Sequence, residues 1–255
     1  MSNYVVRFVN ARIGYDEPVI KDITLSIPRP SLTTILGPPN GSGKTTLLRA
    51  IIKYAKVFGG YAYIDGREIS ELSIGDLPKY VSYSPAEIYS QMALTVLDVV
   101  MSSRNSGGWV SRDEAIATLR YLGVGNIVGK RFDELSTGQK RLTLIARALS
   151  SKAPLLLLDE PTSNLDLGNK YRVILILRRV VSDRGGITVI ATGHDIDLAL
   201  ASDWVVAIRD GGEVMAMGAP GGDIINSKVL SELYGIDVEV LEVNGYRLIH
   251  VRNDR

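Results

Sequence analysis

The chain has no cysteine among its 255 residues, and it carries almost no net charge. The first absence excludes disulfide bonds and thiolate metal sites, although it leaves the redox compartment undetermined. The second, 29 basic against 28 acidic residues for a formal charge of +1, excludes a whole-molecule field that would draw the protein to nucleic acid or an anionic bilayer. Any anion that the protein binds must therefore be held by a local arrangement of groups.

Long apolar runs are missing as well. The most continuous one, around Ala153 to Leu158, is far shorter than the roughly 20 residues needed to cross a bilayer. The first ten residues, MSNYVVRFVN, lack the basic-then-apolar build of a signal peptide. With 45% hydrophobic residues, the chain has enough material for the core of one large or two modest domains. We expect a soluble, cytoplasmic protein.

The hydrophobic pattern indicates an α/β fold. Short β-rich runs occupy the first third, helical spacing dominates from about residue 88 to 150, and unbroken apolar runs return from residue 153. Unbroken runs are typical of parallel strands buried on both faces. We predict a P-loop NTPase core made of residues 1–87 and 151–255, with an N-terminal antiparallel β subdomain and an inserted helical subdomain over residues 88–150.

The individual elements follow from the same pattern. The expected strands are Val5–Val9, Ile23–Ile27, Leu32–Leu36, Tyr61–Asp65, Leu155–Leu158 and Ile187–Ala191. Helices are expected from about Lys44 to about Lys56 and over Lys170–Val181, and a hairpin over Val205–Met217 turning at Asp210-Gly211-Gly212.

The stretch Ile35–Leu48, ILGPPNGSGKTTLL, is a candidate phosphate-binding loop. The usual pattern has a glycine, four residues and then Gly-Lys-Ser/Thr, but the first position holds Pro38, and Gly37 stands one residue too early. We expect binding nonetheless, because the N–H groups that form an anion nest at a helix start lie downstream of that position. The expected nest residues are Asn40, Gly41, Ser42, Gly43, Lys44, Thr45 and Thr46, with Lys44 on the β and γ phosphates and the Thr45 hydroxyl on Mg²⁺.

A pair of acids, Asp159 and Glu160, follows the buried run LLLL. Asp159 at a strand end can hold the Mg²⁺ shell, and Glu160 can orient or deprotonate an attacking water. An acidic turn capping a core strand is a common alternative for such a pair, but its place downstream of a phosphate loop favours the catalytic interpretation.

The segment LSTGQ, Leu135–Gln139, opens an expected helix. Ser136 is a good N-cap, and Gly138 would let backbone amides approach an anion. The phosphate loop, the LSTGQ segment and the acidic pair thus follow one another in the chain. In this respect the chain resembles the ATP-binding-cassette subunits of ABC transporters. The signature of that family, LSGGQ, differs from LSTGQ at one position. The resemblance covers nearly the whole chain. It implies an ATPase that uses ATP and Mg²⁺, and whose residues Ser136, Thr137, Gly138 and Gln139 contact ATP held by a second subunit.

The same resemblance assigns roles to three further residues. It implies that Tyr15 stacks on adenine, although an ordinary tyrosine at a strand end is an alternative. It implies that Asp166 ends a D-loop, Ser163-Asn164-Leu165-Asp166. It also implies that His194, one of two histidines, is a switch residue near the γ phosphate. Glu160, His194 and Lys44 are therefore the expected catalytic residues, and Thr45 and Asp159 the expected metal ligands.

One position departs from the family pattern. The family has Pro-Gln after a strand, where this chain has Pro85-Ala86. The glutamine that should help ligate Mg²⁺ and sense the membrane partner is thus replaced by alanine, and neither Glu87 nor Gln91 aligns as a substitute. Water or Glu87 could fill the vacated ligand position. We expect water, since Mg²⁺ readily keeps water ligands and the charge of Glu87 would oppose the triphosphate.

The sequence therefore favours an ATPase subunit of an ABC transporter. The resemblance implies a homodimer, or a dimer with a related ATPase subunit, on the inner face of the cell membrane and docked on permease subunits, with no nucleic acid partner. The tail Val229–Val240 is similar to that of importers of iron chelates, haem and cobalamin, though a generic helix-to-strand ending is equally typical. The main alternative is a catalytically weakened nucleotide-binding scaffold or regulator. A chromosome or repair ATPase would need a long heptad-rich insertion, and a translation factor a second cassette.

Overall fold

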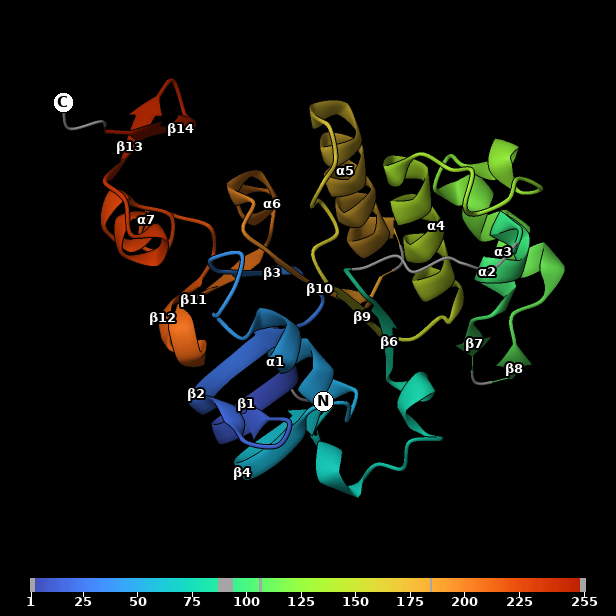
Figure 1. Cartoon of the computed structure of the whole chain (residues 1–255), viewed down its shortest axis with the longest axis horizontal. Helices are drawn as coiled ribbons and strands as arrows, with labels where there is room; N and C mark the ends of the chain where they lie inside the picture. Colours follow the sequence, from blue (N-terminus) through green and yellow to red (C-terminus); the bar gives the residue numbers. More distant parts are fainter. Residues whose placement is uncertain (1–2, 87–93, 106, 184, 253–255) are drawn as a thin grey trace.

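A central six-stranded sheet organises the molecule (Figure 1). The computed structural model describes residues 3–86, 94–105, 107–183 and 185–252. The strand order is β12-β11-β3-β10-β9-β6, and all neighbours are parallel except β11 and β12. The strands are β3 Leu32–Leu36, β6 Val81–Ser84, β9 Leu155–Leu158, β10 Thr188–Gly193, β11 Trp204–Ile208 and β12 Val214–Gly218.

Both faces of this sheet are covered. Leu155 and Leu157 of β9 pack into one hydrophobic core, with α1 and the N-terminal strands, whereas Leu156 and Leu158 pack into another, with helices α2 to α5. Successive side chains of a strand point to opposite faces, so an unbroken leucine run serves both cores. This confirms the predicted parallel, doubly buried strands.

A second, antiparallel sheet lies beneath α1 in Figure 1, in the order β2-β1-β4-β5. Its strands are β1 Tyr4–Gly14, β2 Pro18–Pro28, β4 Lys56–Ile64 and β5 Arg67–Glu68. They alternate buried and exposed residues, as expected for a sheet with one covered face. The predicted N-terminal β subdomain is confirmed, with longer strands than the sequence indicated.

Helix α1, Lys44–Ile51, is shorter than predicted. The chain leaves the helix at Ile52, Lys53 adopts a left-handed backbone with φ of +61°, and β4 already begins at Lys56. The Lys53 amine donates to the carbonyls of Ser70 (3.0 Å) and Leu72 (2.7 Å). The predicted end near Lys56 is therefore wrong, because contacts to a distant segment stop the helix.

The remaining helices surround the upper face and the two ends of the sheet (Figure 1). Helices α2 Val96–Met101, α3 Arg112–Tyr121 and α4 Thr137–Ser150 gather beyond β6, with the short hairpin β7 Arg104–Asn105 and β8 Gly108–Trp109; α5 Leu167–Asp183, α6 Ile196–Leu200 and α7 Ser227–Tyr234 follow. Short 3₁₀ turns span Ile69–Glu71, Leu77–Lys79, Gly125–Ile127 and Asp210–Gly212, and the terminal hairpin is β13 Val238–Val243 and β14 Tyr246–Val251. Within the described ranges, no helix is long and apolar enough to span a membrane.

Candidate active site

Four neighbouring strand ends build the site. Strands β3, β10, β9 and β6 lie side by side and run parallel, so the segments that follow them meet at one edge of the sheet. These segments are the phosphate loop after β3, His194 after β10, Asp159 and Glu160 after β9, and Pro85-Ala86 after β6. The sheet thus brings together the residues that the sequence placed at strand ends.

The phosphate loop leaves β3 through Gly37. Its N–H donates to the carbonyl of Gly193 at 3.1 Å, and a Cβ at this position would lie 2.5 Å from the carbonyl oxygen of Ile208. Further on, Gly41 and Gly43 have φ values of +83° and +81°, a left-handed backbone that glycine adopts without steric cost. Gly43 precedes the first residue of α1 and has no side chain to cap the helix. The N–H groups at this helix start are therefore available to an anion.

Lys44 turns its side chain back onto this loop. The amine is buried and donates to the carbonyls of Gly37 (3.3 Å) and Pro38 and to the Ser42 hydroxyl (3.1 Å). Burial lowers the pKa of Lys44, while the charges of Glu160 and Asp159 act in the opposite direction. Pro38 is half-buried, and its carbonyl is part of the Lys44 environment.

Asp159 is the centre of the polar network. It is 2% exposed, and its Oδ1 accepts from the hydroxyls of Thr45 (2.9 Å) and Thr192 (2.7 Å), while its Oδ2 accepts from Tyr83 (3.1 Å). The predicted metal ligands Thr45 and Asp159 are thus in direct contact. Hydroxyl and carboxylate oxygens at a phosphate-binding helix start suit Mg²⁺, which commonly uses one or two such groups together with phosphate oxygens.

Glu160 is held beside this network by its backbone and side chain. Its φ is +46°, an uncommon conformation that costs on the order of 1–3 kcal/mol for a residue other than glycine. The Glu160 N–H donates to the Thr192 hydroxyl at 3.0 Å, and its carboxylate accepts from Ser163 at 2.6 Å. The bend and these two bonds fix the direction of a carboxylate that remains partly exposed.

His194 is exposed immediately after β10. Its carbonyl accepts from the hydroxyl of Tyr234, at the end of α7, at 2.9 Å. The imidazole borders a hollow of about 500 Å³ that is also lined by Ser163 and Asn164 of the predicted D-loop. The histidine, the D-loop and the C-terminal helix therefore meet at one place.

The signature segment begins α4 as predicted. Ser136 and Gln139 form a capping box in which the Ser136 hydroxyl accepts from Gln139 N (3.4 Å) and Gln139 Oε1 accepts from Ser136 N (3.2 Å). Ser136 and Thr137 are exposed, whereas Gly138 is buried so closely on Asn169 that a Cβ would lie 2.7 Å from its side chain. These exposed residues are accessible to a second molecule.

Asp166 and Tyr15 make contacts that the sequence did not predict. The Asp166 carboxylate accepts from the backbone (2.9 Å) and the side chain (2.6 Å) of Asn169, which lowers the pKa of Asp166. The Tyr15 hydroxyl accepts from Arg49 of α1 at 3.1 Å. Their roles at a nucleotide stay predictions.

The segment after β6 is fixed by an arginine of α4. Arg141 is buried and donates to the carbonyls of Pro85 (3.1 Å) and Ala86 (2.9 Å). Glu87 and Gln91, the positions weighed as substitutes for the family glutamine, lie outside the described residues.

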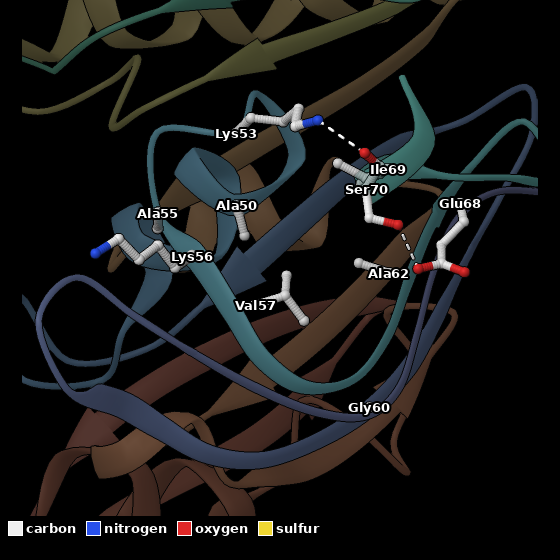
Figure 2. Close-up of a pocket in the computed structure, with 10 residues that line it drawn as sticks. All are labelled: Ala50, Lys53, Ala55, Lys56, Val57, Gly60, Ala62, Glu68, Ile69 and Ser70. Atoms are coloured by element: carbon white, nitrogen blue, oxygen red, sulfur yellow. Dashed lines mark hydrogen bonds between the residues drawn. The ribbon is translucent and has the colours of Figure 1, made fainter. Parts of the chain in front are cut away.

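A second hollow, of about 390 Å³, lies at the other end of α1 (Figure 2). Figure 2 shows Lys53 and Ser70 at its border, joined by a hydrogen bond. None of the phosphate-loop residues is among the residues that line it.

Several residues of the site escaped the sequence analysis: Arg49, Tyr83, Arg141, Ser163, Thr192 and Tyr234. Thr192 and Tyr83 could have been noticed, because each stands two residues before a motif position.

Comparisons with known proteins agree with this arrangement. The family model described as ABC transporter matches residues 20–163. An ABC transporter ATP-binding protein of Methanocaldococcus jannaschii is 34% identical over 246 residues, covering 93% of this chain and 84% of the relative. The petrobactin import ATP-binding protein of Bacillus subtilis is 29% identical, covering 95% and 97%, and the hemin import ATP-binding protein of Rhodococcus jostii is 29% identical, covering 93% and 82%.

A solved structure is similar over most of the chain. It is a dimeric ATP-binding cassette in a post-hydrolysis state with ADP and Pi, 25% identical, with a TM-score of 0.72 and coverage of 85% of this chain and 99% of that one. The fold therefore matches that of a nucleotide-binding cassette.

Proposed function

This chain belongs to the ABC transporter family, and on that premise we propose that it is the Mg²⁺-dependent ATPase subunit of an importer, acting through a separate membrane permease. The observation that carries the proposal is the hydrogen bond from Thr45 to Asp159. It joins the start of the phosphate-loop helix to the acidic pair, so Thr45 and Asp159 would together hold a Mg²⁺ ion that neutralises phosphate charge.

In the proposed reaction, phosphate oxygens replace the loop carbonyls as acceptors for the Lys44 amine, and the N–H groups at the start of α1 bind the β and γ phosphates. Thr45 and Asp159 would hold Mg²⁺, which neutralises charge on these phosphates. Glu160, aimed by Ser163, orients the attacking water and accepts its proton. The water oxygen bonds to the γ phosphorus, and the bond from this phosphorus to ADP breaks, which releases ADP and phosphate.

A dimer completes the site. The related cassette with ADP and Pi is dimeric, and Ser136 and Thr137 are exposed at the start of α4. We place this helix start against the nucleotide of a second subunit, where its N–H groups contact the γ phosphate. ATP then binds the closed dimer more tightly than the monomer, and hydrolysis releases the two subunits.

The permease docks, in this proposal, on a groove of about 330 Å³ beside β6. Its border carries Ile74 and Trp109, which are 78% and 68% exposed. Large apolar side chains at the edge of a groove are typical of protein interaction sites. The groove separates the core from residues 88–150, which we propose as the helical subdomain. Import is supported by the relatives named for petrobactin and hemin import.

Glu160→Gln tests the catalytic assignment. The variant keeps the shape of the carboxylate but is a much weaker base, so phosphate release is expected to fall by about 10²- to 10⁴-fold, while affinity for the fluorescent nucleotide mant-ATP stays within a few-fold. Glu71→Gln, an exposed acid on a 3₁₀ turn, should leave both unchanged. A wild-type chain that binds mant-ATP but releases phosphate no faster than Glu160→Gln would instead identify a nucleotide-binding scaffold.

A further inference from the structure

Tyr83 occupies a position that the proposed mechanism does not use. It belongs to β6, two residues before Pro85, and its hydroxyl donates to Asp159 Oδ2 at 3.1 Å. The two residues are 76 positions apart in the chain. Thr45 and Thr192 both donate to Oδ1 of Asp159. Within the described part of the chain, Tyr83 donates to the other carboxylate oxygen, Oδ2.

The direction of this bond follows from the chemistry of its partners. A carboxylate has acceptors and no donor, whereas a guanidinium has donors and no acceptor, so the Tyr83 phenol directs its proton to Asp159. Arg49 donates to the Tyr15 hydroxyl at 3.1 Å, and its interactions with Tyr15 first and then with Tyr83 raise the pKa of Arg49. Tyr83 therefore has a cationic neighbour, Arg49, and an anionic acceptor, Asp159.

We propose that Tyr83, oriented by Arg49, is a positioning residue that holds the Asp159 carboxylate for Mg²⁺. The proposal rests on the Mg²⁺ site of the proposed function. Through Tyr83, the segment in which Ala86 replaces the family glutamine still contacts a proposed metal ligand, Asp159. Tyr83 also lines the groove beside β6, so the same residue adjoins the surface where we place the permease.

The test separates binding of the metal from binding of the nucleotide. The full chain is titrated with a non-hydrolysable mant-ATP analogue, once with saturating Mg²⁺ and once with EDTA. The dissociation constant in EDTA is then divided by the dissociation constant in Mg²⁺, and this ratio measures how much the metal tightens nucleotide binding. Tyr83→Phe should reduce this ratio by about 10- to 100-fold, as expected for loss of one hydrogen bond to a charged group, with the EDTA value unchanged. Arg49→Lys keeps a cation and should reduce the ratio less.

Tyr80→Phe is the matched control. Tyr80 precedes β6, is also half-buried, and contacts Arg67 rather than Asp159, so its variant should keep the wild-type ratio. An unchanged ratio in Tyr83→Phe would overturn the proposal, and so would an equal loss of affinity with and without Mg²⁺, because a merely structural role weakens both. A wild-type ratio of one would instead refute the proposed Mg²⁺ site itself.

Discussion

At the scale of single residues, Lys44 shows a conflict between binding and stability. Its amine is buried among carbonyls, and burial lowers its pKa. A lysine with a lowered pKa binds fewer protons in the folded than in the unfolded state. The free energy of unfolding contributed by Lys44 therefore rises with pH between the lowered pKa and the usual value of 10.5. In the proposed function, the positive charge of Lys44 binds phosphate, but its burial lowers the stability of the nucleotide-free protein.

Lys44→Met should expose this conflict. Methionine fills a similar volume without a charge to desolvate, so the nucleotide-free variant is expected to melt at the wild-type temperature or a few degrees above it. The rise in melting temperature that Mg-ATP gives the wild type should disappear. Thermal melts with and without nucleotide measure both effects. A variant that melts several degrees lower, yet is still stabilised by ATP, would contradict the role of Lys44 on phosphate.

Whether the position of a site residue could be predicted depended on the residues next to it in the sequence. Lys44, Asp159 and His194 each follow an apolar strand, so their position at one edge of a sheet could be predicted. Tyr83 and Arg49 could not, because their roles come from side chains far away in the sequence, Asp159 and Tyr15. Spacing carries information about the backbone, and it says little about which distant side chains meet.

At the scale of elements, three of the described helices begin with a capping box, and in two of them, α3 and α4, the N-cap is a serine. Ser111 and Ser136 are N-caps with complete capping boxes, using Glu114 and Gln139. An N-cap serine contributes about 1 kcal/mol to stability, since it satisfies an N–H that the helix leaves unpaired. The two caps therefore allow local stability to be separated from function.

Ser111→Ala and Ser136→Ala should each lower the free energy of unfolding by about 1 kcal/mol, measured by urea denaturation. Ser136→Ala alone should also weaken ATP-dependent self-association, measured in the Glu160→Gln background, because we place Ser136 on the nucleotide of the partner subunit. Equal association of the two variants would count against the signature role of α4.

The end of α1 shows where prediction of elements failed. Helical spacing of apolar residues continues past Ile51, yet the helix stops there. Lys53 is drawn into a left-handed conformation while its amine binds Ser70 and Leu72. The limit is thus set by tertiary contacts. The strands of the central sheet were predictable because their unbroken apolar runs match burial on both faces.

At the scale of the whole molecule, the proposed nucleotide site needs two separate parts of the chain. The phosphate loop and acidic pair lie at the sheet edge, whereas Ser136 and Thr137 are exposed at the start of α4. In a dimer with a twofold axis, the phosphate loop of each copy can face the start of α4 of the other copy, so that two sites form, as in isologous dimers. Binding of ATP and association are then linked.

Glu160→Gln with Mg-ATP should therefore shift from monomer to dimer in light scattering, since ATP persists when hydrolysis is slow. Ser136→Arg in the same background should restore the monomer, because a large side chain blocks the approach of α4. The same variant with ADP serves as the control and should remain monomeric. A Glu160→Gln chain that stays monomeric at high protein concentration and saturating ATP would rule out the sandwich for the isolated subunit.

The bond from Tyr234 to the His194 carbonyl has a practical consequence for handling the protein. It connects α7 to the segment that carries His194, and the hairpin after this helix places Ile249 on the same hollow as His194. An affinity tag or fluorophore fused to the C-terminus is therefore expected to disturb the position of the hairpin and of the Tyr234–His194 hydrogen bond. The opposite terminus leads into β1, in the antiparallel sheet, and is the better attachment point for assays that must report unperturbed turnover.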